Sequence, residues 1–164
     1  LKRSENTAEV VVRLSDALRY MIYESNEKWV DLEKEIEFIR NYIELQKLRT
    51  HFSDVVNLAV QGKVSHQQIA PLVFIVFVEN AFKHGLKGDV ENQFIRIHFK
   101  ITDHHIEFLS ENNTGTSGYP EKEPHSGLGL ENVKRRLELT YPGKHELQIV
   151  QRGNVFSVHL SIEL

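Results

Sequence analysis

Three polar side chains lie together at the end of an otherwise apolar stretch near the middle of the chain. Asn80 is followed by Lys83 and His84, three and four residues on, so in a helix they share one face. A carboxamide oxygen, an ammonium group and an imidazole on one face can hold a hydrated Mg²⁺ ion and the phosphates that it bridges. Mg²⁺ prefers oxygen ligands and retains several waters, so one Asn oxygen is a sufficient protein contact. The alternative is a plain helix end, where Gly85 follows the cap and both basic residues favour the negative end of the dipole.

Two glycines form a second candidate site further along the chain. Gly127 and Gly129 precede a predicted helix that continues to about residue 141. Paired glycines let the backbone approach a ligand closely, and the free amides of the following helix point at any phosphate. The dinucleotide fingerprint does not fit, because its third glycine position is Asn132, and no Gly-Lys-Ser/Thr of a P-loop occurs. The alternative is a flexible helix start after a loop.

The elements that must position these residues begin with a helical hairpin over residues 5–50. In each of two predicted helices the apolar residues recur every three or four positions. They are Val11, Leu14, Leu18, Met21 and Ile22 in the first, and Leu32, Ile36, Ile39 and Ile43, widened by Phe38, Tyr42 and Leu45, in the second. Asp31 is the predicted N-cap of the second helix. A lone hairpin leaves apolar surface uncovered, and half of a four-helix bundle is one natural use of it.

From residue 54 onward the hydrophobic period becomes that of strands. Alternation of apolar and polar residues predicts strands near 56–60, 95–101, 106–108, 147–149 and 156–162. Helices are predicted over 69–84 and 127–141, and a polar loop over 111–126. Turns are expected at Thr102-Asp103 and Gly153-Asn154. These elements predict an α+β fold: a two-layer α/β sandwich, in which a mixed, mostly antiparallel sheet packs on helices behind the N-terminal hairpin. The change of period near residue 51 predicts a domain boundary.

The composition excludes several classes of protein. The chain has 164 residues, 40% of them hydrophobic and 26% charged, which are ordinary globular values. Its net charge of −3 lacks the basic footprint of a nucleic-acid binder, and the absence of Cys excludes disulfides, thiolate metal sites and a Cys nucleophile. Leu1 is not an initiator Met, so we expect a fragment of a longer protein. The apolar run Ile69–Val78, interrupted by Pro71, is shorter than the ~20 residues that span a bilayer.

The two candidate clusters together resemble a known family. FVENAFKHG (residues 77–85), followed by SGLGLENVKRRLELTYPG (126–143), is similar to the N-box and second glycine box of the histidine-kinase ATP-binding domain. Gyrase, the heat-shock-ninety chaperones and the mismatch-repair ATPases share that fold. Upstream, LSDALRYMIYES (14–25) and VDLEKEIEFIRNYIELQKLR (30–49) look like the LytS/YehU-type sensor histidine kinases. The resemblance covers nearly the whole chain.

This resemblance implies roles for individual residues. Asn80 would be the ligand of Mg²⁺, Lys83 would contact phosphate, and Glu79 is a candidate for polarising the attacking group; these three are the implied catalytic residues. Residues 112–126 would be the ATP lid. The implied ATP-binding residues are Asn80, Lys83, His84, Asn112, Gly127, Leu128, Gly129 and Leu130.

The sequence departs from the family pattern in two places. The first glycine box normally carries an Asp that accepts a hydrogen bond from the adenine amino group; here Asn112 aligns with it, and Glu111 does so if the register differs by one. The phosphoacceptor block, which resembles Pro-His-Phe-Leu-Phe-Asn, is missing, and none of the nine His has that context. The chain is therefore expected to begin just after that block, and autophosphorylation is not expected from this chain alone.

The resemblance then implies the following organisation and function. Residues 1–50 would be the rear of the dimerisation and phosphotransfer domain, and residues 51–164 the ATP-binding catalytic domain. The domain would transfer the γ-phosphoryl group of ATP to an upstream His and thence to a response regulator, with ATP and Mg²⁺ as cofactors. A homodimer through the N-terminal helices is expected, in the cytoplasmic part of a bacterial inner-membrane protein.

Two alternatives remain open. The first is a nucleotide-free dimerisation or docking module derived from this fold. The second is an ATPase of the gyrase or chaperone branch, which places an acid four residues before the metal-binding Asn; Val76 occupies that position here and argues against it.

Overall fold

The computed structural model describes residues 2–49, 53–85, 93–114 and 128–164. Its helices are α1 (Lys2–Arg19), the π-helix η1 (Tyr20–Glu24), α2 (Leu32–Arg49), the 3-10 turn η2 (Ser53–Val55), α3 (Ile75–Gly85) and α4 (Leu128–Thr140). Its strands are β1 (Val30–Asp31), β2 (Val56–Gly62), β3 (Gln68–Ile69), β4 (Ile95–Ile101), β5 (His105–Asn113), β6 (His145–Arg152) and β7 (Val155–Glu163). Among these described residues, no helix is both long and apolar enough to cross a membrane.

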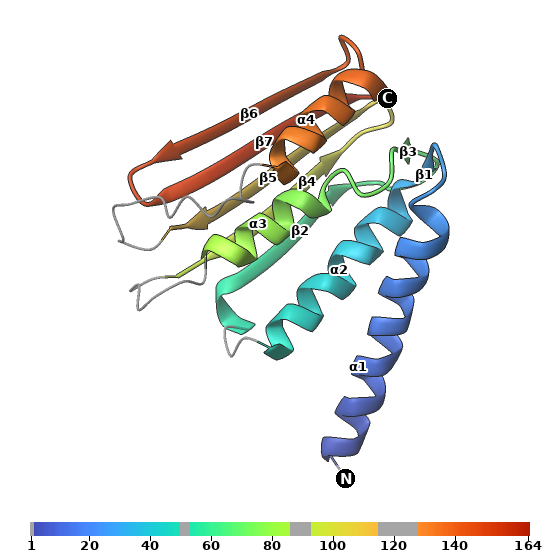
Figure 1. The fold of residues 1–164 in the computed structure, drawn as a ribbon, viewed down its shortest axis with the longest axis vertical. Helices are drawn as coiled ribbons and strands as arrows, with labels where there is room; N and C mark the ends of the chain where they lie inside the picture. Colours follow the sequence, from blue (N-terminus) through green and yellow to red (C-terminus); the bar gives the residue numbers. More distant parts are fainter. Residues whose placement is uncertain (1, 50–52, 86–92, 115–127) are drawn as a thin grey trace.

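The main sheet has the strand order β2-β4-β5-β7-β6. The pair β2–β4 is parallel and the other three pairs are antiparallel. Figure 1 shows α3 and α4 lying side by side over one face of this sheet, with α2 next to α3 and α1 outermost. The predicted α+β class and two-layer sandwich are therefore confirmed, as are the turns at Thr102-Asp103 and Gly153-Asn154.

The core lies between the sheet and its helices. In β4 the alternate residues Ile95, Ile97, Phe99 and Ile101 are buried, while Arg96 and Lys100 between them are exposed, as the period of two predicted. Four aromatic rings form the centre: Phe74, Phe99 and Phe108 lie with ring centroids 5.0 Å apart in each pair, and Phe77 lies 5.9 Å from Phe108. This cluster joins β4 and β5 to α3 and to the segment that leads into it.

The predicted helix over 69–84 is wrong at its start, because α3 begins only at Ile75. Ile69 instead pairs with Val30 in a small two-stranded sheet. Pro71 disfavours a helical conformation at the residue before it, and Leu72 has a φ of 59°, in the left-handed region. Both features interrupt a stretch that by hydrophobicity alone is indistinguishable from a buried helix.

The predicted loop over 111–126 also begins too early. Residues 111–113 belong to β5, where Asn112 lies in register with Ile95 on one side and Phe156 on the other. Ladder pairing on both sides satisfies the backbone groups of this polar stretch, which its composition did not predict. Residues 115–126 lie outside the described part of the chain.

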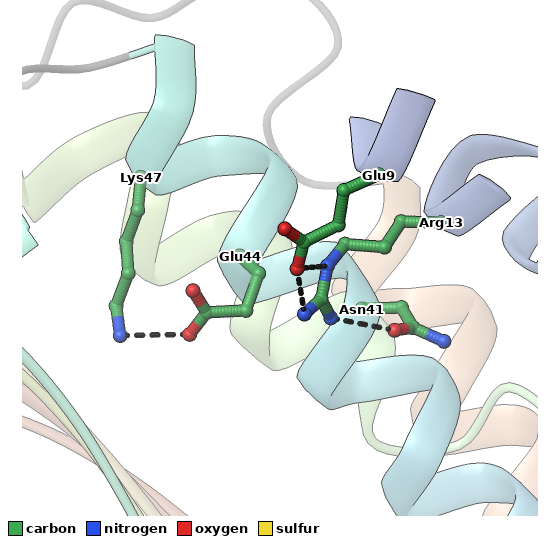
Figure 2. Close-up of polar contacts among 5 residues, drawn as sticks. All are labelled: Glu9, Arg13, Asn41, Glu44 and Lys47. Atoms are coloured by element: carbon green, nitrogen blue, oxygen red, sulfur yellow. Dashed lines mark hydrogen bonds and ion pairs between the residues drawn. The ribbon is translucent and has the colours of Figure 1, made fainter. Parts of the chain in front are cut away.

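The N-terminal hairpin is confirmed, and its first helix turns an apolar stripe outward. Arg13 Nη1 on α1 donates a hydrogen bond to Asn41 Oδ1 on α2 at 3.1 Å, and Glu9 pairs with Arg13 at 2.8 Å; Figure 2 shows these contacts beside the Glu44–Lys47 pair. Among the side chains of α1 and η1 that the structure describes, Ala17 and Tyr20 are buried. By contrast, the predicted stripe of Val11, Leu14, Leu18, Met21 and Ile22 is 43–59% exposed.

Candidate functional site

Helix α3 has one buried face and one polar row. Its buried residues are Ile75, Phe77, Val78, Ala81, Phe82 and Gly85. The remaining residues, Val76, Glu79, Asn80, Lys83 and His84, recur at helical spacing and form the outward row; Glu79 and Lys83 are exposed, and Asn80 and His84 are half-buried. Packing of the apolar face on the sheet therefore aims all four polar candidates of α3 away from the core. The expectation that Asn80, Lys83 and His84 share one face is met.

The start of α4 lies beside this outward row. A Cβ atom added to Gly129 would lie 3.5 Å from Val76 Cγ1, and Val76 is one helical turn before Asn80. Leu130 is partly buried against the core. Leu128 begins α4, and Gly127 lies outside the described residues. The structure thus brings Gly129 and the row of Asn80 together, although they are about fifty residues apart in sequence.

Asn112 lies at the other end of α3. It is 1% exposed, and a Cβ atom added to Gly85 would come within 2.8 Å of its Cβ, so it packs directly on the last residue of the helix. Its Nδ2 donates a hydrogen bond to the carbonyl oxygen of Asn113 at 3.1 Å. Glu111 takes the opposite face of β5, because successive strand residues alternate. Of the two residues proposed for the adenine contact, only Asn112 faces the helical layer.

Partial shielding of its carboxyl group from water changes the acid-base properties of Glu79, although the residue is exposed. Removal of water around its carboxyl group raises the pKa of Glu79 above the usual range for a Glu. Because Glu79 belongs to the outward row, a raised pKa keeps its carboxylate a better proton acceptor than an ordinary surface Glu. The position is compatible with the predicted role of polarising an attacking group.

Two polar features near α3 were missed by the sequence analysis. Asn113 is 2% exposed, and its Oδ1 accepts a hydrogen bond from the Phe94 amide at 2.9 Å. In the sequence, only its place beside Asn112 could have drawn attention to this residue. Glu35, on α2, is fully buried, and its Oε2 accepts hydrogen bonds from the Tyr20 hydroxyl and, at 3.0 Å, from the Leu72 amide. In the sequence Glu35 is distinguished only by its place in the first turn of a helix, where a negative charge is favourable.

Sequence comparisons identify relatives of the chain. The family model described as Histidine kinase matches residues 1–53. The Sensor histidine kinase BtsS of Escherichia coli K12 is 31% identical over 134 residues, which cover 82% of this chain and 23% of that protein. The Sensor protein LytS of Enterococcus faecalis is 23% identical over 175 residues, covering 99% of this chain and 29% of that protein. The chain is a homologue of the sensor histidine kinases. It spans about a quarter of the length of these curated relatives.

Solved histidine-kinase structures share the fold. The catalytic domain of the histidine kinase ThkA, in a nucleotide-free form, superposes with a TM-score of 0.57 at 14% identity, covering 82% of this chain and 93% of that one. The structure of ThkA in complex with the response regulator protein TrrA gives a TM-score of 0.53 at 16% identity, covering 95% of this chain and 48% of that one. The resemblance to the histidine-kinase fold, which the residue motifs predicted, is therefore confirmed.

Proposed function

We propose that this chain is the ATP-binding catalytic domain of a two-component sensor histidine kinase. It would transfer the γ-phosphoryl group of ATP to a His outside this chain, and a response regulator would then receive the group. The observation that carries the proposal is the outward row of α3, which bears Asn80 and Lys83, with Gly129 beside one end and Asn112 against the other. In this proposal residues 1–50 are the rear of the dimerisation region and residues 51–164 are the catalytic domain.

The residues present fit a Mg²⁺–nucleotide complex. Asn80 is half-buried and offers a carboxamide oxygen, the kind of hard ligand that Mg²⁺ prefers, so Asn80 is the residue that would hold the metal. When bound, Mg²⁺ would supply positive charge that offsets the negative charge of the phosphates. The exposed Lys83 would offset the charge that develops on the transferred group, and His84 would contact phosphate or ribose.

The N-terminus of α4 provides the second phosphate contact. The first amides of a helix have no partner within the helix, and the dipole there favours an anion. A residue without a side chain at position 129 leaves room for phosphate oxygens beside Val76. We propose that the backbone of Gly127 and Gly129 covers the triphosphate, with Leu128 and Leu130 supporting the pocket, and that the stretch from the end of β5 to residue 126 acts as the lid.

Asn112 would accept the hydrogen bond from the adenine amino group. It faces the helical layer at the end of α3 that lies beyond Lys83 and His84, so base and phosphates would lie along one helix. An amide oxygen accepts this bond without the assistance of a charge, which weakens it by about 1 kcal/mol relative to a carboxylate. Modest adenine affinity follows from this substitution.

Calorimetric titration of the chain with Mg-ADP tests the proposal. We expect saturable binding with a Kd below about 1 mM, the upper end of the usual range for enzyme substrates. Addition of EDTA should weaken the binding, because Asn80 is proposed to act through the metal. Mg-GDP is the control ligand, and it should bind more weakly, since its base presents an acceptor where adenine presents an amino group. Absence of heat, with no rise in melting temperature at millimolar Mg-ADP, would contradict the proposal.

The second candidate function is a nucleotide-free dimerisation or docking module. One observation favours it: Asn112 is 1% exposed and already bonds the Asn113 carbonyl. The same titration separates the two functions, because the module predicts no response to Mg-ADP.

We further propose that the parent protein is a homodimer joined through its N-terminal helices. The stripe on α1 is apolar and exposed while the opposite side of α1 packs on α2, which is the arrangement of half a helical bundle. Response regulators are the proposed protein partners, as ThkA is seen with TrrA.

Charge placed in the α1 stripe should disrupt this dimer. Leu18→Glu puts a carboxylate where the proposed partner helix packs, so we expect a dimer for the unchanged chain and a monomer for the variant in analytical ultracentrifugation. Leu18 is 45% exposed, so the melting temperature of the monomer should change little. Leu139→Glu on α4, at a residue 75% exposed, is the control and should leave the dimer intact. A monomeric unchanged chain at about 100 μM, far above a typical dimer Kd, would sink the idea.

A further inference from the structure

The segment that leads into α3 is held by side chains from three other elements. The Ala70 amide donates a hydrogen bond to the Tyr141 hydroxyl, just after α4, at 2.8 Å. The Leu72 amide donates to Glu35 Oε2 on α2 at 3.0 Å, and the same oxygen accepts from the Tyr20 hydroxyl in η1. The backbone here cannot bond to itself as a helix does, because Leu72 is left-handed, so these side chains fix its position.

Burying the carboxyl group of Glu35 to hold this segment carries a desolvation penalty. It is fully buried, and burial raises the pKa of its carboxyl group, against the hydrogen bonds from Tyr20 and the amides of residues 72–74, which lower it. An apolar residue of similar volume would give a more stable fold, provided the groups around it were also apolar. The partners of Glu35 are instead polar groups on two separate parts of the fold. A buried carboxylate in this place is therefore better explained by what it connects than by stability.

A series of side-chain and backbone contacts links the end of the first helix to the outward row that contains Asn80. Tyr20 stacks on Phe38 with ring centroids 4.6 Å apart, so its hydroxyl is held in place. Tyr20 also begins the π-helix η1, and such bulges are frequent at functional sites. At the far end, the Phe74 carbonyl accepts hydrogen bonds from the amides of Phe77 and Val78, which open the first turn of α3. A movement of α1 along α2 would thus reach α3 through Tyr20 and Glu35.

We propose that Glu35 is a positioning residue that couples the α1–α2 hairpin to α3. By holding residues 72–74 it sets the orientation of the outward row, and Tyr20 sets the orientation of Glu35. This inference rests on the proposed function for its effect on nucleotide affinity. Its effect on the backbone of α3 does not depend on that function.

The test uses Glu35→Gln and Tyr20→Phe, singly and together, in the full 164-residue chain. Three quantities are measured: Mg-ADP affinity, hydrogen exchange of the amides in residues 72–80, and melting temperature. Glu35→Gln keeps the size of the side chain but removes its charge, so we expect about fivefold weaker Mg-ADP binding and faster exchange. Tyr20→Phe should act in the same direction. The double variant should equal Glu35→Gln, because Tyr20 is proposed to act only through Glu35.

Ile162→Val is the matched control. Ile162 is fully buried on β7, in register with Ile106 and His145 and not with Tyr20 or Glu35, so the variant should lower the melting temperature while leaving Mg-ADP affinity and exchange at residues 72–80 unchanged. Glu35→Gln behaving like this control, or additive effects of the two substitutions, would overturn the proposal. If Glu35→Gln does not fold, Tyr20→Phe alone tests the proposal through the same three measurements. If the unchanged chain binds no Mg-ADP, the proposed function fails, and hydrogen exchange still decides the coupling.

Discussion

Asn80→Ala is expected to weaken Mg-ADP binding by about 100-fold, the upper end of what the loss of groups around a metal costs. Asn80 is the residue proposed to contact the metal directly, and alanine offers no oxygen in its place. The side chain is half-buried in the outward row of α3, so its removal opens no cavity in the core. The melting temperature without nucleotide should therefore fall by only a few degrees, as for a substitution of about 1 kcal/mol or less.

Titration calorimetry of the variant, with and without EDTA, measures this effect. In the unchanged chain EDTA should weaken binding, whereas in Asn80→Ala it should have almost no further effect, since the contribution of the metal is already lost. Asn57→Ala, at an exposed Asn on β2, is the matched control and should bind as the unchanged chain does. If Asn80→Ala instead unfolds the domain, Asn80 is a structural residue at the helix end and its assignment to the metal is wrong.

Phe108→Ala is expected to lower the free energy of unfolding by about 3–5 kcal/mol, the usual cost of removing a buried aromatic ring. Phe108 is fully buried and contacts the rings of Phe74, Phe77 and Phe99, so the cavity would open at the junction of sheet and helices. Neighbouring rings cannot collapse into it without losing their own contacts. A domain of ordinary stability has only about 5–15 kcal/mol in total, so this one ring accounts for a large part of it.

Urea unfolding followed by circular dichroism gives the required free energies. Leu139→Ala, at a residue 75% exposed on α4, shortens an apolar side chain on the surface instead of in the core and should change stability by less than about 0.5 kcal/mol. A loss below about 1 kcal/mol for Phe108→Ala would mean that the aromatic cluster is not the centre of the core.

Much of the fold was predictable because the patterns that encode it are local. Strict alternation in Ile95–Ile101 predicted a strand with one buried face, and that is how β4 lies. The spacing of Asn80, Lys83 and His84 placed them on one helical face, because helix geometry alone determines which residues are neighbours three and four positions apart. The glycine and N-box motifs were likewise local, and they predicted the resemblance to histidine kinases that the relatives confirm.

The errors came where distant parts of the chain decide the local conformation. The apolar run from residue 69 has the hydrophobicity of a helix, yet β1 pairs with Ile69 and Glu35 binds the Leu72 amide, so the helix starts at Ile75. The polar run from Glu111 has the composition of a loop, yet it is flanked by β4 and β7, which complete its hydrogen bonds. No window of neighbouring residues contains these partners.

The sequence by itself therefore determined most of the kinds of element, the polar row of the N-box helix and the resemblance to histidine kinases. Only the tertiary structure decided that Gly129 lies beside Val76, that Asn112 rather than Glu111 faces the helices, and that α1 turns its apolar stripe outward. It also revealed Glu35, whose partners are an amide thirty-seven residues later and a hydroxyl fifteen residues earlier. The physical reason is that periodicity records which side of an element is apolar, whereas packing decides what covers that side and which distant polar groups meet in the interior.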